Sequence, residues 1–393
     1  MLRLLQSATV HAPEPLGTRD LLVAGDQVVW MGEPDTAQLA GLDVERVDLS
    51  GLRVIPGLVD CHVHLTGGGG EDGFHSQVPP VPLSLFTRGG TTTVVGVLGT
   101  DDTTRGTASL VAAARGMTEQ GLSAYCLTGG YHFPPVTLTG SVRGDIVHVD
   151  RILGVGELAL SDHRSSQPSL DQFLQVVADA HVGGMLSRKA GYSHLHLGDG
   201  ERGLQLVRQA LDTSELPPRV FHPTHVNRRR ALFTEALELV ERGCTVDVTS
   251  FPVAEGEDAW SATDAWLQYR DAGLSPDRLT ISSDAGGSLP HFDADGRVDG
   301  MEVAGPHSLG DVLAELLQQG VELSEALPAF TSNPARVVGL AKGSIQVGRD
   351  ADLVVLNPDH SARDVMAMGR WHVREGRQQI QGTFESREPQ ENS

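Results

Sequence analysis

Apolar and polar residues alternate along this chain in two patterns, and each pattern predicts a different kind of element. At both ends, period-two alternation punctuated by glycine, proline and aspartate predicts short strands and turns. The N-terminal candidates are Leu2–Thr9, Asp20–Ala24, Gln27–Gly32 and Arg46–Leu49. The C-terminal strands and turns are expected in 343–356, Val365–Gly369, Trp371–Val373 and Gln379–Phe384. Residues 386–393 have the composition of a disordered tail.

The long middle of the chain, residues 56–342, alternates short apolar runs with amphipathic helical patterns. The predicted strands are Leu58–His64, Thr92–Leu98, Ala124–Thr128, Ile152–Leu160, Ser193–Leu197, Val220–His225, Thr245–Thr249 and Leu279–Ser283. Helical patterns between them include Thr104–Gln120, Leu170–Val182, Glu201–Leu211, Arg229–Arg242 and Trp260–Ala272. Repeated β/α units of this kind are typical of a (β/α)8 barrel, and no Gly-x-Gly-x-x-Gly follows the first strand to favour a doubly wound sheet.

We therefore predict an α/β fold with two parts. Residues 56–342 are expected to form a (β/α)8 TIM-like barrel. Because β-like segments flank this region at both ends, residues 1–55 and 343–385 are expected to assemble into one small β-sandwich.

Composition narrows the partners and the compartment of the protein. The chain has 393 residues, a formal net charge of −21 and no basic cluster beyond Arg228-Arg229-Arg230, which disfavours nucleic acid and anionic membranes as partners. Its three cysteines, Cys61, Cys126 and Cys244, fit neither a disulfide framework nor a Cys-x-x-Cys metal site. The N-terminus lacks a sustained apolar region, and no apolar run reaches the length of a membrane span. We expect a cytoplasmic protein that acts on a small molecule.

Side chains that bind metals recur at the ends of the predicted strands, where barrel enzymes carry their active sites. The first strand ends with His62 and His64, whose spacing of two places both imidazoles on one face. Later strands supply Glu157, His196, His225 and Asp284. Four histidines and two carboxylates can hold two divalent metal ions that share a bridging group and a hydroxide. Zinc is the metal that these ligands favour.

The order of these ligands resembles the amidohydrolase superfamily, and further motifs resemble its isoaspartyl (β-aspartyl) dipeptidases. These motifs are Gly67-Gly-Gly-Gly-Glu71, Leu98-Gly-Thr-Asp101, Thr128-Gly-Gly-Tyr-His132, Ser161-Asp-His-Arg164, Pro223-Thr-His-Val-Asn-Arg228 and Ser282-Ser-Asp-Ala-Gly-Gly-Ser288. The similarity extends from the N-terminal strands to the C-terminal strands. It implies a homo-oligomeric metallo-dipeptidase that cleaves the isopeptide bond of β-aspartyl dipeptides.

One position departs from the pattern of that family, in which a carboxylated lysine usually bridges the two metals. The matching position here is Glu157, in Val155-Gly-Glu-Leu-Ala-Leu-Ser-Asp162. The two lysines of the chain, Lys189 and Lys342, lie before the fifth barrel strand and beyond the barrel. A glutamate supplies the same charge and two oxygens on a shorter side chain, so we expect Glu157 to bridge the metals and activity to be independent of bicarbonate.

The predicted mechanism follows from charge. Two bridged divalent ions lower the pKa of their shared water, so that hydroxide is available near neutral pH, and they polarise the scissile carbonyl. Asp284 is the candidate general base, and later the acid that protonates the leaving amine. By resemblance, Tyr131 donates to the tetrahedral oxyanion. Asp162 and His163 are expected only to orient neighbouring groups.

Substrate recognition needs groups opposite in charge to those of the dipeptide. A β-aspartyl dipeptide presents a free α-ammonium group, for which Glu71 is the expected partner, and two carboxylates, which Arg164 and Arg228 can grip in bidentate fashion. By resemblance, the remaining substrate contacts come from Gly69, Thr100 and Ser288.

Two alternative functions remain at this point. A cyclic amidase of the dihydroorotase or hydantoinase type is disfavoured by Glu71 and the two arginines, because a cyclic imide lacks the α-amine. A non-catalytic oligomeric scaffold is disfavoured by the intact ligand set. Among β-aspartyl dipeptides, β-Asp-Arg from cyanophycin is a conceivable substrate, but no sequence feature identifies the pocket for the second side chain.

Overall fold

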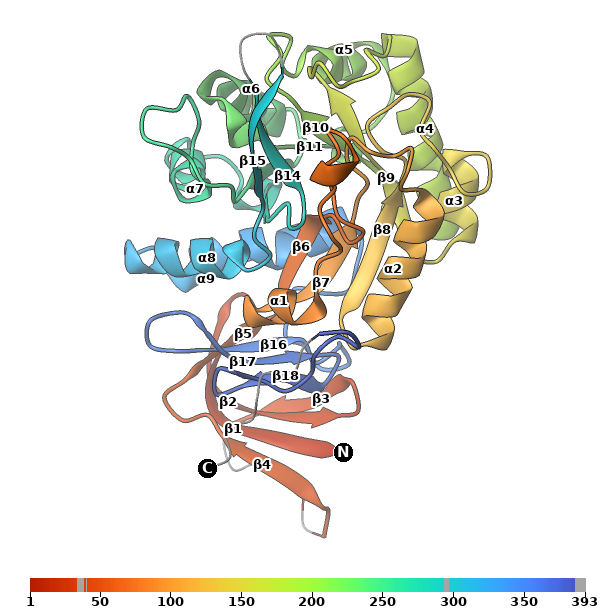
Figure 1. Cartoon of the computed structure of the whole chain (residues 1–393). Helices are drawn as coiled ribbons and strands as arrows, with labels where there is room; N and C mark the ends of the chain where they lie inside the picture. The colour runs from red at the N-terminus through yellow and green to blue at the C-terminus, as the bar shows by residue number, and fades with distance from the viewer. Residues whose placement is uncertain (34–38, 40, 293–296, 386–393) are drawn as a thin grey trace.

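The computed structural model describes residues 1–33, 39, 41–292 and 297–385, and the predicted tail at 386–393 lies outside the described residues. Figure 1 shows a strand-rich body that holds both ends of the chain, with a barrel surrounded by helices above it. This arrangement confirms the predicted fold class. Among the described residues, no helix combines the length and the apolar character needed to cross a membrane.

Strands from both ends of the chain form one nine-stranded sheet. The N-terminal strands are β1 (Leu2–His11), β2 (Pro15–Ala24), β3 (Gln27–Gly32), β4 (Val44–Asp48) and β5 (Arg53–Pro56). The C-terminal strands are β16 (Leu353–Leu356), β17 (Ala362–Ala367), β18 (Arg370–Arg374) and β19 (Arg377–Gln378). Their order is β19-β18-β17-β16-β5-β1-β2-β3, and β4 pairs with β1. The division of the chain at residues 55 and 343 itself stays a prediction.

The two ends meet where β5 pairs antiparallel with β16, so that Val54 lies opposite Val355. Both valines belong to a separate apolar core that also includes Met366 and Trp371. The expected β structure in Gln379–Phe384 is wrong, because β19 ends at Gln378. The amides of Gln379 and Ile380 both donate to the carbonyl of His372, so regular pairing stops there.

Eight parallel strands form the barrel, as predicted: β6 (Leu58–Val63), β7 (Thr91–Gly96), β8 (Ser123–Thr128), β9 (Ile152–Leu160), β10 (Tyr192–Leu197), β11 (Phe221–Thr224), β12 (Val246–Thr249) and β13 (Leu279–Ser282). Strands β6 to β11 are hydrogen-bonded in sequence order, and β12 pairs with β13. The chain after β13 closes the ring on β6, because the amide of Asp284 donates to the carbonyl of His62 at 3.1 Å and the amide of His64 donates to the carbonyl of Ala285 at 2.8 Å.

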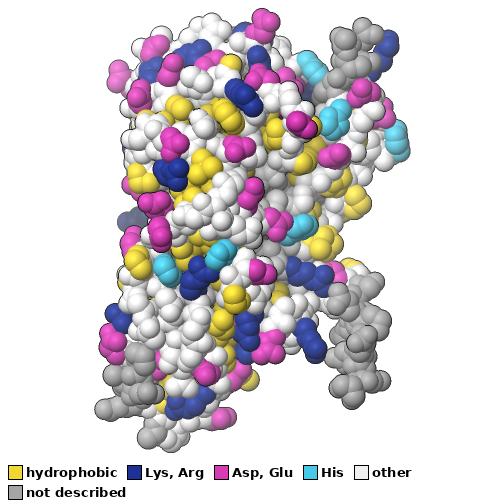
Figure 2. Space-filling model, turned by 90° about the vertical axis from the view of Figure 1, so that its left-hand side faces the viewer, with side chains coloured by type: hydrophobic (Ala, Val, Ile, Leu, Met, Phe, Trp, Pro, Cys, Tyr) yellow, Lys and Arg dark blue, Asp and Glu magenta, His cyan; other side chains and the backbone are white. Residues whose placement is uncertain are grey.

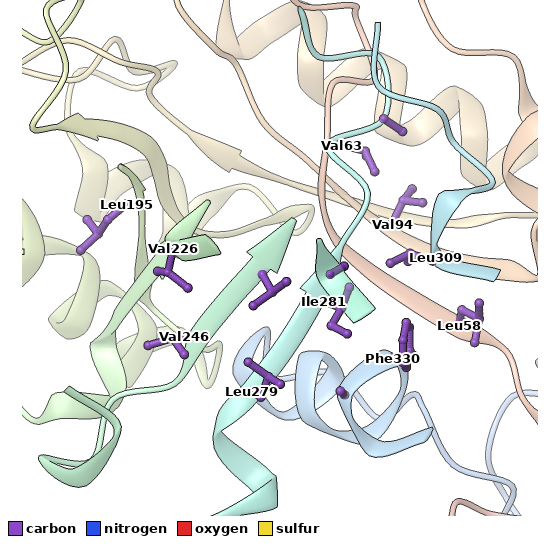
Figure 3. Packing of buried hydrophobic residues seen from close by; sticks show 14 of the residues in the cluster. Leu58, Val63, Val94, Leu195, Val226, Val246, Leu279, Ile281, Leu309 and Phe330 are labelled. Carbon is purple, nitrogen blue, oxygen red and sulfur yellow. The ribbon is translucent and has the colours of Figure 1, made fainter. Parts of the chain in front are cut away.

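Helices follow the strands and cover the outside of the barrel (Figure 1). They are α1 (Leu83–Arg88), α2 (Thr107–Glu119), α3 (Val142–His148), α4 (Leu170–Ser187), α5 (Gln205–Thr213), α6 (Arg230–Glu241), α7 (Ala262–Asp271), α8 (Ser308–Gln318), α9 (Leu323–Ala326) and α10 (Ser332–Val337). Apolar side chains on the outer faces of the strands pack against them, and Figure 3 shows Leu279, Ile281 and Phe330 in this main core.

A β-hairpin that the sequence analysis did not identify follows the last barrel strand. Strands β14 (Ser288–Phe292) and β15 (Val298–Val303) pair antiparallel, with Ser288 opposite Val303. The Asp-Gly pair at 295–296 is a hairpin signal that could have identified it. Figure 1 shows the hairpin beside the barrel. Its first residue, Ser288, lines the same pocket as His64 and Asp284.

The chain has a formal net charge of −21, yet side chains of both signs lie on its surface (Figure 2). On the face seen in Figure 2, acidic and basic side chains are interspersed and no broad basic area is visible.

Candidate active site

The predicted metal ligands converge at the carboxyl ends of the barrel strands. His62 lies on β6 and His64 just after it, Glu157 and His196 lie on β9 and β10, and His225 and Asp284 follow β11 and β13. All six side chains are buried. Because strand residues two apart point to one side, β6 directs both of its histidines to the same point.

Distances divide the cluster into two overlapping groups: His62 with His64 and Asp284, and His62 with Glu157 and His225. Asp284 Oδ1 lies 3.0 Å from His64 Nε2 and 3.3 Å from His62 Nε2. Glu157 Oε2 lies 3.0 Å from His225 Nε2, while Glu157 Oε1 faces His64 Nε2 at 3.8 Å. The Glu157 carboxylate therefore lies between the two groups, where a bridging ligand would lie.

His196 contacts Glu157 of the cluster through one ring nitrogen and the neighbouring carboxylate of Asp162 through the other. His196 Nδ1 is 2.9 Å from Glu157 Oε2, and His196 Nε2 is 2.9 Å from Asp162 Oδ2. His225 is held similarly, since His225 Nδ1 lies 2.8 Å from Thr249 Oγ1. Such partners fix the orientation and tautomer of a ligating imidazole. Asp162 thus has the orienting contact expected of it, whereas His163 is exposed.

Unpartnered polar atoms test whether these residues fit a metal. His62 Nε2 and Asp284 Oδ1 are buried without a hydrogen-bond partner, and they face each other. Buried polar atoms without partners are costly and therefore rare. A cation between these atoms would satisfy both, so the donor set fits divalent metal ions with nitrogen and oxygen ligands.

Charge in the cluster also favours a bound cation. Burial disfavours the imidazolium of His62, but Glu157 and Asp284 outweigh burial and raise the pKa of His62 to about 9. Burial likewise opposes ionisation of Asp284, but His62 and His64 hold the pKa of Asp284 below its ordinary value. Burial lowers the pKa of His225 to about 3, which leaves a neutral imidazole. The carboxylates therefore attract positive charge, and neutral imidazole is available to bind it.

Neither lysine reaches this cluster. Lys189 Nζ donates to the carbonyls of Ile146 and Val149 at 2.7 and 2.6 Å. Lys342 Nζ pairs with Asp350 and with Asp352, the latter at 2.6 Å. Glu157 is therefore the residue that places a carboxylate between the two ligand groups.

One pocket contains the predicted metal ligands other than His62, together with the whole predicted substrate shell. Its lining is His64, Gly69, Glu71, Gly99, Thr100, Tyr131, Glu157, Arg164, His196, His225, Arg228, Asp284, Ser288 and Pro290. His62 lies fully buried behind it. Gly99 and Pro290 were not predicted. Pro290 lines the pocket as part of β14, the first strand of the hairpin.

Several of the substrate-binding candidates are joined by ion pairs and hydrogen bonds. Glu71 Oε1 accepts from Arg164 Nη1 at 3.2 Å and from Ser288 Oγ at 3.0 Å. Arg164 Nη2 also pairs with Asp162 Oδ2 at 2.7 Å, so its guanidinium already contacts two carboxylates. Arg228 is less engaged, with Nε 3.8 Å from Asp199 Oδ1. Of the two arginines, Arg228 is the more available receptor for a substrate carboxylate.

Tyr131 faces the metal ligands from the opposite wall. Its hydroxyl lies 2.8 Å from His196 Nδ1, and the Arg164 guanidinium lies 5.3 Å from the centre of its ring. Burial, together with the charge of Glu157, raises the pKa of Tyr131 well above its ordinary value. The phenol therefore remains protonated and can donate a hydrogen bond at the pH where peptidases work.

Comparison with known proteins places this site in a family. Residues 193–386 match the Amidohydrolase family. A D-hydantoinase, 16% identical, has the same fold with a TM-score of 0.66 and covers 98% of each chain. A dihydroorotase of Anaplasma phagocytophilum (strain HZ) is 25% identical over 86% of this chain and 82% of that protein.

Greater similarity is found to a β-aspartyl dipeptidase of Fervidobacterium islandicum AW-1. Its complex with the β-Asp-Leu dipeptide is 40% identical, with a TM-score of 0.90 over 96% of this chain and 98% of that chain. A second structure of the dipeptidase from this organism is 39% identical, with a TM-score of 0.88 over 96% and 99% of the two chains. The chain therefore belongs to the β-aspartyl dipeptidase family of the amidohydrolase superfamily and is a hydrolase that acts on dipeptides.

Proposed function

We propose that this enzyme hydrolyses the β-aspartyl isopeptide bond of dipeptides with two divalent metal ions, with zinc expected from the donor set. The observation that carries the proposal is the single pocket in which the metal-binding cluster adjoins Glu71, Arg164, Arg228 and Ser288. The relative that was solved with β-Asp-Leu supports the same substrate class. Cytoplasmic location and homo-oligomeric assembly stay predictions.

The residues present would hold the ions as two sets. His62, His64 and Asp284 suit one ion, His196 and His225 suit the other, and Glu157 suits a position between them. When bound, such ions supply Lewis-acid chemistry: they acidify a water molecule and polarise the scissile carbonyl.

The chain's own side chains supply the proton transfers and the contacts to the substrate. Asp284, whose low pKa keeps it ionised, takes the proton of the attacking water and passes it to the leaving amine. Tyr131 donates its hydroxyl hydrogen to the oxygen that gains charge as the carbonyl carbon becomes tetrahedral. Glu71, buried beside Ser288, binds the α-ammonium, and Arg228 binds a carboxylate.

A neighbouring cavity suits the side chain of the second residue. It has a volume of about 410 Å³ and shares Arg164, Arg228 and Pro290 with the active-site pocket. Phe251 and Leu289 give it apolar surface, and its acidic lining residues are Asp199, Glu257, Asp258 and Glu302. Arg229 and His291 also line this cavity, so its charge is mixed. Its apolar surface and four carboxylates can accept a long basic side chain, so we include β-Asp-Arg among the substrates.

A substrate panel tests the reaction. We expect hydrolysis of β-Asp-Leu and β-Asp-Arg, and no hydrolysis of α-Asp-Leu or dihydroorotate. Glu302→Gln and Glu257→Gln should lower kcat/KM for β-Asp-Arg several-fold while leaving β-Asp-Leu unchanged. Equal effects on both dipeptides would refute the assignment of the cavity.

A cyclic amidase is the second candidate, because a dihydroorotase aligns over most of the chain. Glu71 argues against it, since its buried carboxylate matches an ammonium that a cyclic imide lacks. Turnover of dihydroorotate that exceeds turnover of β-Asp-Leu would replace the dipeptidase proposal.

A further inference from the structure

The interior of the barrel beneath the metal-binding cluster is unusually polar. Strand alternation directs Val246 and Ile281 toward the helices, where they join the main apolar core. His194, His222 and Asp247 are also buried, but they are not part of that apolar core. A (β/α)8 barrel is normally filled by bulky apolar side chains at this level. Buried polar groups are costly unless they are fully hydrogen-bonded, so their partners indicate what they do.

These side chains form one continuous chain of hydrogen bonds that begins at His62. His62 Nδ1 lies 2.9 Å from His194 Nε2, and His194 Nδ1 lies 2.9 Å from His222 Nδ1. His222 Nε2 lies 3.0 Å from Thr280 Oγ1, and Thr280 Oγ1 donates to Asp247 Oδ1 at 2.5 Å. The metal-binding cluster is thus connected to a carboxylate that touches none of its ligands.

The chemistry of imidazole fixes the direction of donation along this series of hydrogen bonds. If His62 Nε2 binds a metal, the proton of that ring is on Nδ1 and is donated to His194 Nε2. His194 then donates from Nδ1 to His222 Nδ1, and His222 donates from Nε2 to Thr280. The Thr280 hydroxyl donates in turn to Asp247. Every bond agrees with one neutral tautomer for each ring, and each donor points away from the metal.

Asp247 is the acceptor at the end of this series of hydrogen bonds. Thr224 Oγ1 donates to its Oδ2 at 2.7 Å, Ser282 Oγ donates to its Oδ2 at 2.5 Å, and Cys61 Sγ donates to its Oδ1 at 3.4 Å. With Thr280, four donors surround a carboxylate that is fully buried. Burial, aided by the charge of His62, lowers the pKa of His222 to about 3, so that ring remains neutral.

We propose that Asp247 is a positioning residue for the metal centre, acting on His62 through Thr280, His222 and His194. By accepting at the end of the chain, it holds the proton of His62 on Nδ1 and leaves Nε2 free for the metal. Direct carboxylate partners of metal-binding histidines have this effect, and here two further imidazoles extend it through the barrel. The inference rests on the metal site of the proposed function, but it makes no assumption about the substrate.

Two threonines provide a matched test. Thr280 and Thr224 are both fully buried and both donate to Asp247, but Thr280 alone of the two contacts His222. Thr280→Val cuts the chain and removes one donor from Asp247, whereas Thr224→Val removes one donor and leaves the chain intact. Thr280→Ser restores the hydroxyl.

The readout is zinc affinity, measured by chelator competition, with the visible absorption of the Co²⁺-loaded protein as a second measure. We expect Thr280→Val and Asp247→Asn to weaken binding of the ion that His62 would hold by about 10- to 100-fold, the range for groups that support metal ligands. Thr224→Val should weaken it much less, and Thr280→Ser should recover most of the affinity. Thermal unfolding of the metal-free proteins should occur at a lower temperature for Thr280→Val than for Thr224→Val, because Thr280→Val also leaves the Nε2 hydrogen of His222 unpaired, and Thr280→Ser should reverse this loss.

Two results would overturn the proposal. One is equal zinc affinity in the two valine variants, which would reduce Thr280 to a structural role. The other is a third bound ion that Asp247→Asn removes, because Cys61, His222 and Asp247 also lie close enough together to hold a metal. A protein that binds zinc as expected but does not cleave β-Asp-Leu would contradict the proposed substrate and leave this inference standing.

Discussion

Replacing Glu157 by glutamine tests the centre of the proposed site. The substitution keeps the shape of the side chain and removes its charge from the point where it faces His62, His196 and His225, at distances of 3.5, 2.9 and 3.0 Å. Because the side chain is 1% exposed, solvent screens this charge poorly.

The size of the effect follows from the pKa of His62. Glu157 and Asp284 overcome burial and raise this pKa from 6.5 to about 9. At about 1.4 kcal/mol for each tenfold change, the net stabilisation of one positive charge, after the cost of burial, is about 3 kcal/mol. Glutamine would remove the contribution of Glu157, and a metal ion carries two charges, so we expect Glu157→Gln to weaken binding of at least one ion by about 100-fold or more.

Chelator competition and metal quantification on the purified variants provide the assay, with β-Asp-Leu hydrolysis measured alongside. Glu71→Gln is the control, because it removes another carboxylate of the same pocket, one that pairs with Arg164 and Ser288. It should raise KM and leave metal content unchanged. A Glu157→Gln enzyme that keeps two metals and full activity would refute the bridging role.

Three further predictions concern the same site. Tyr131→Phe should lower kcat by about 100-fold with little change in metal content, and unchanged kcat would remove Tyr131 from the reaction. Activity of the zinc-loaded enzyme should be independent of bicarbonate, because Lys189 is held by two backbone carbonyls; a carbamate found on Lys189 in the active enzyme would contradict this. In urea titrations, the metal-free protein should lose up to about 3 kcal/mol of unfolding free energy as the pH rises from 6.5 to 9. The raised pKa of His62 stabilises the folded state fully below pH 6.5, and this stabilisation is lost as the pH rises through about 9. Bound zinc should abolish that loss. If the unfolding free energy of the metal-free protein did not change between pH 6.5 and 9, His62 would not carry the charge.

Local patterning was sufficient to predict the strands of the barrel. The apolar runs predicted all eight barrel strands within a few residues, and β9 at Ile152–Leu160 matches in full. Side-chain alternation then predicted that His62 and His64 share a face. Both conclusions depend on interactions between residues close in sequence, which a strand or a helix fixes by its own geometry.

The tertiary structure decided the features that depend on distant segments. The β14–β15 hairpin brings Pro290 to the pocket, and the guanidinium of Arg164 forms ion pairs with Glu71 and Asp162. Likewise, His194 and His222 are only apolar-strand histidines in the sequence. In the closed barrel the His194 side chain meets that of His62, and the His222 side chain meets that of His194. Period-two alternation shows which side chains point inward, but which of them meet depends on how the eight strands are staggered around the ring, and that is set by packing of the whole barrel.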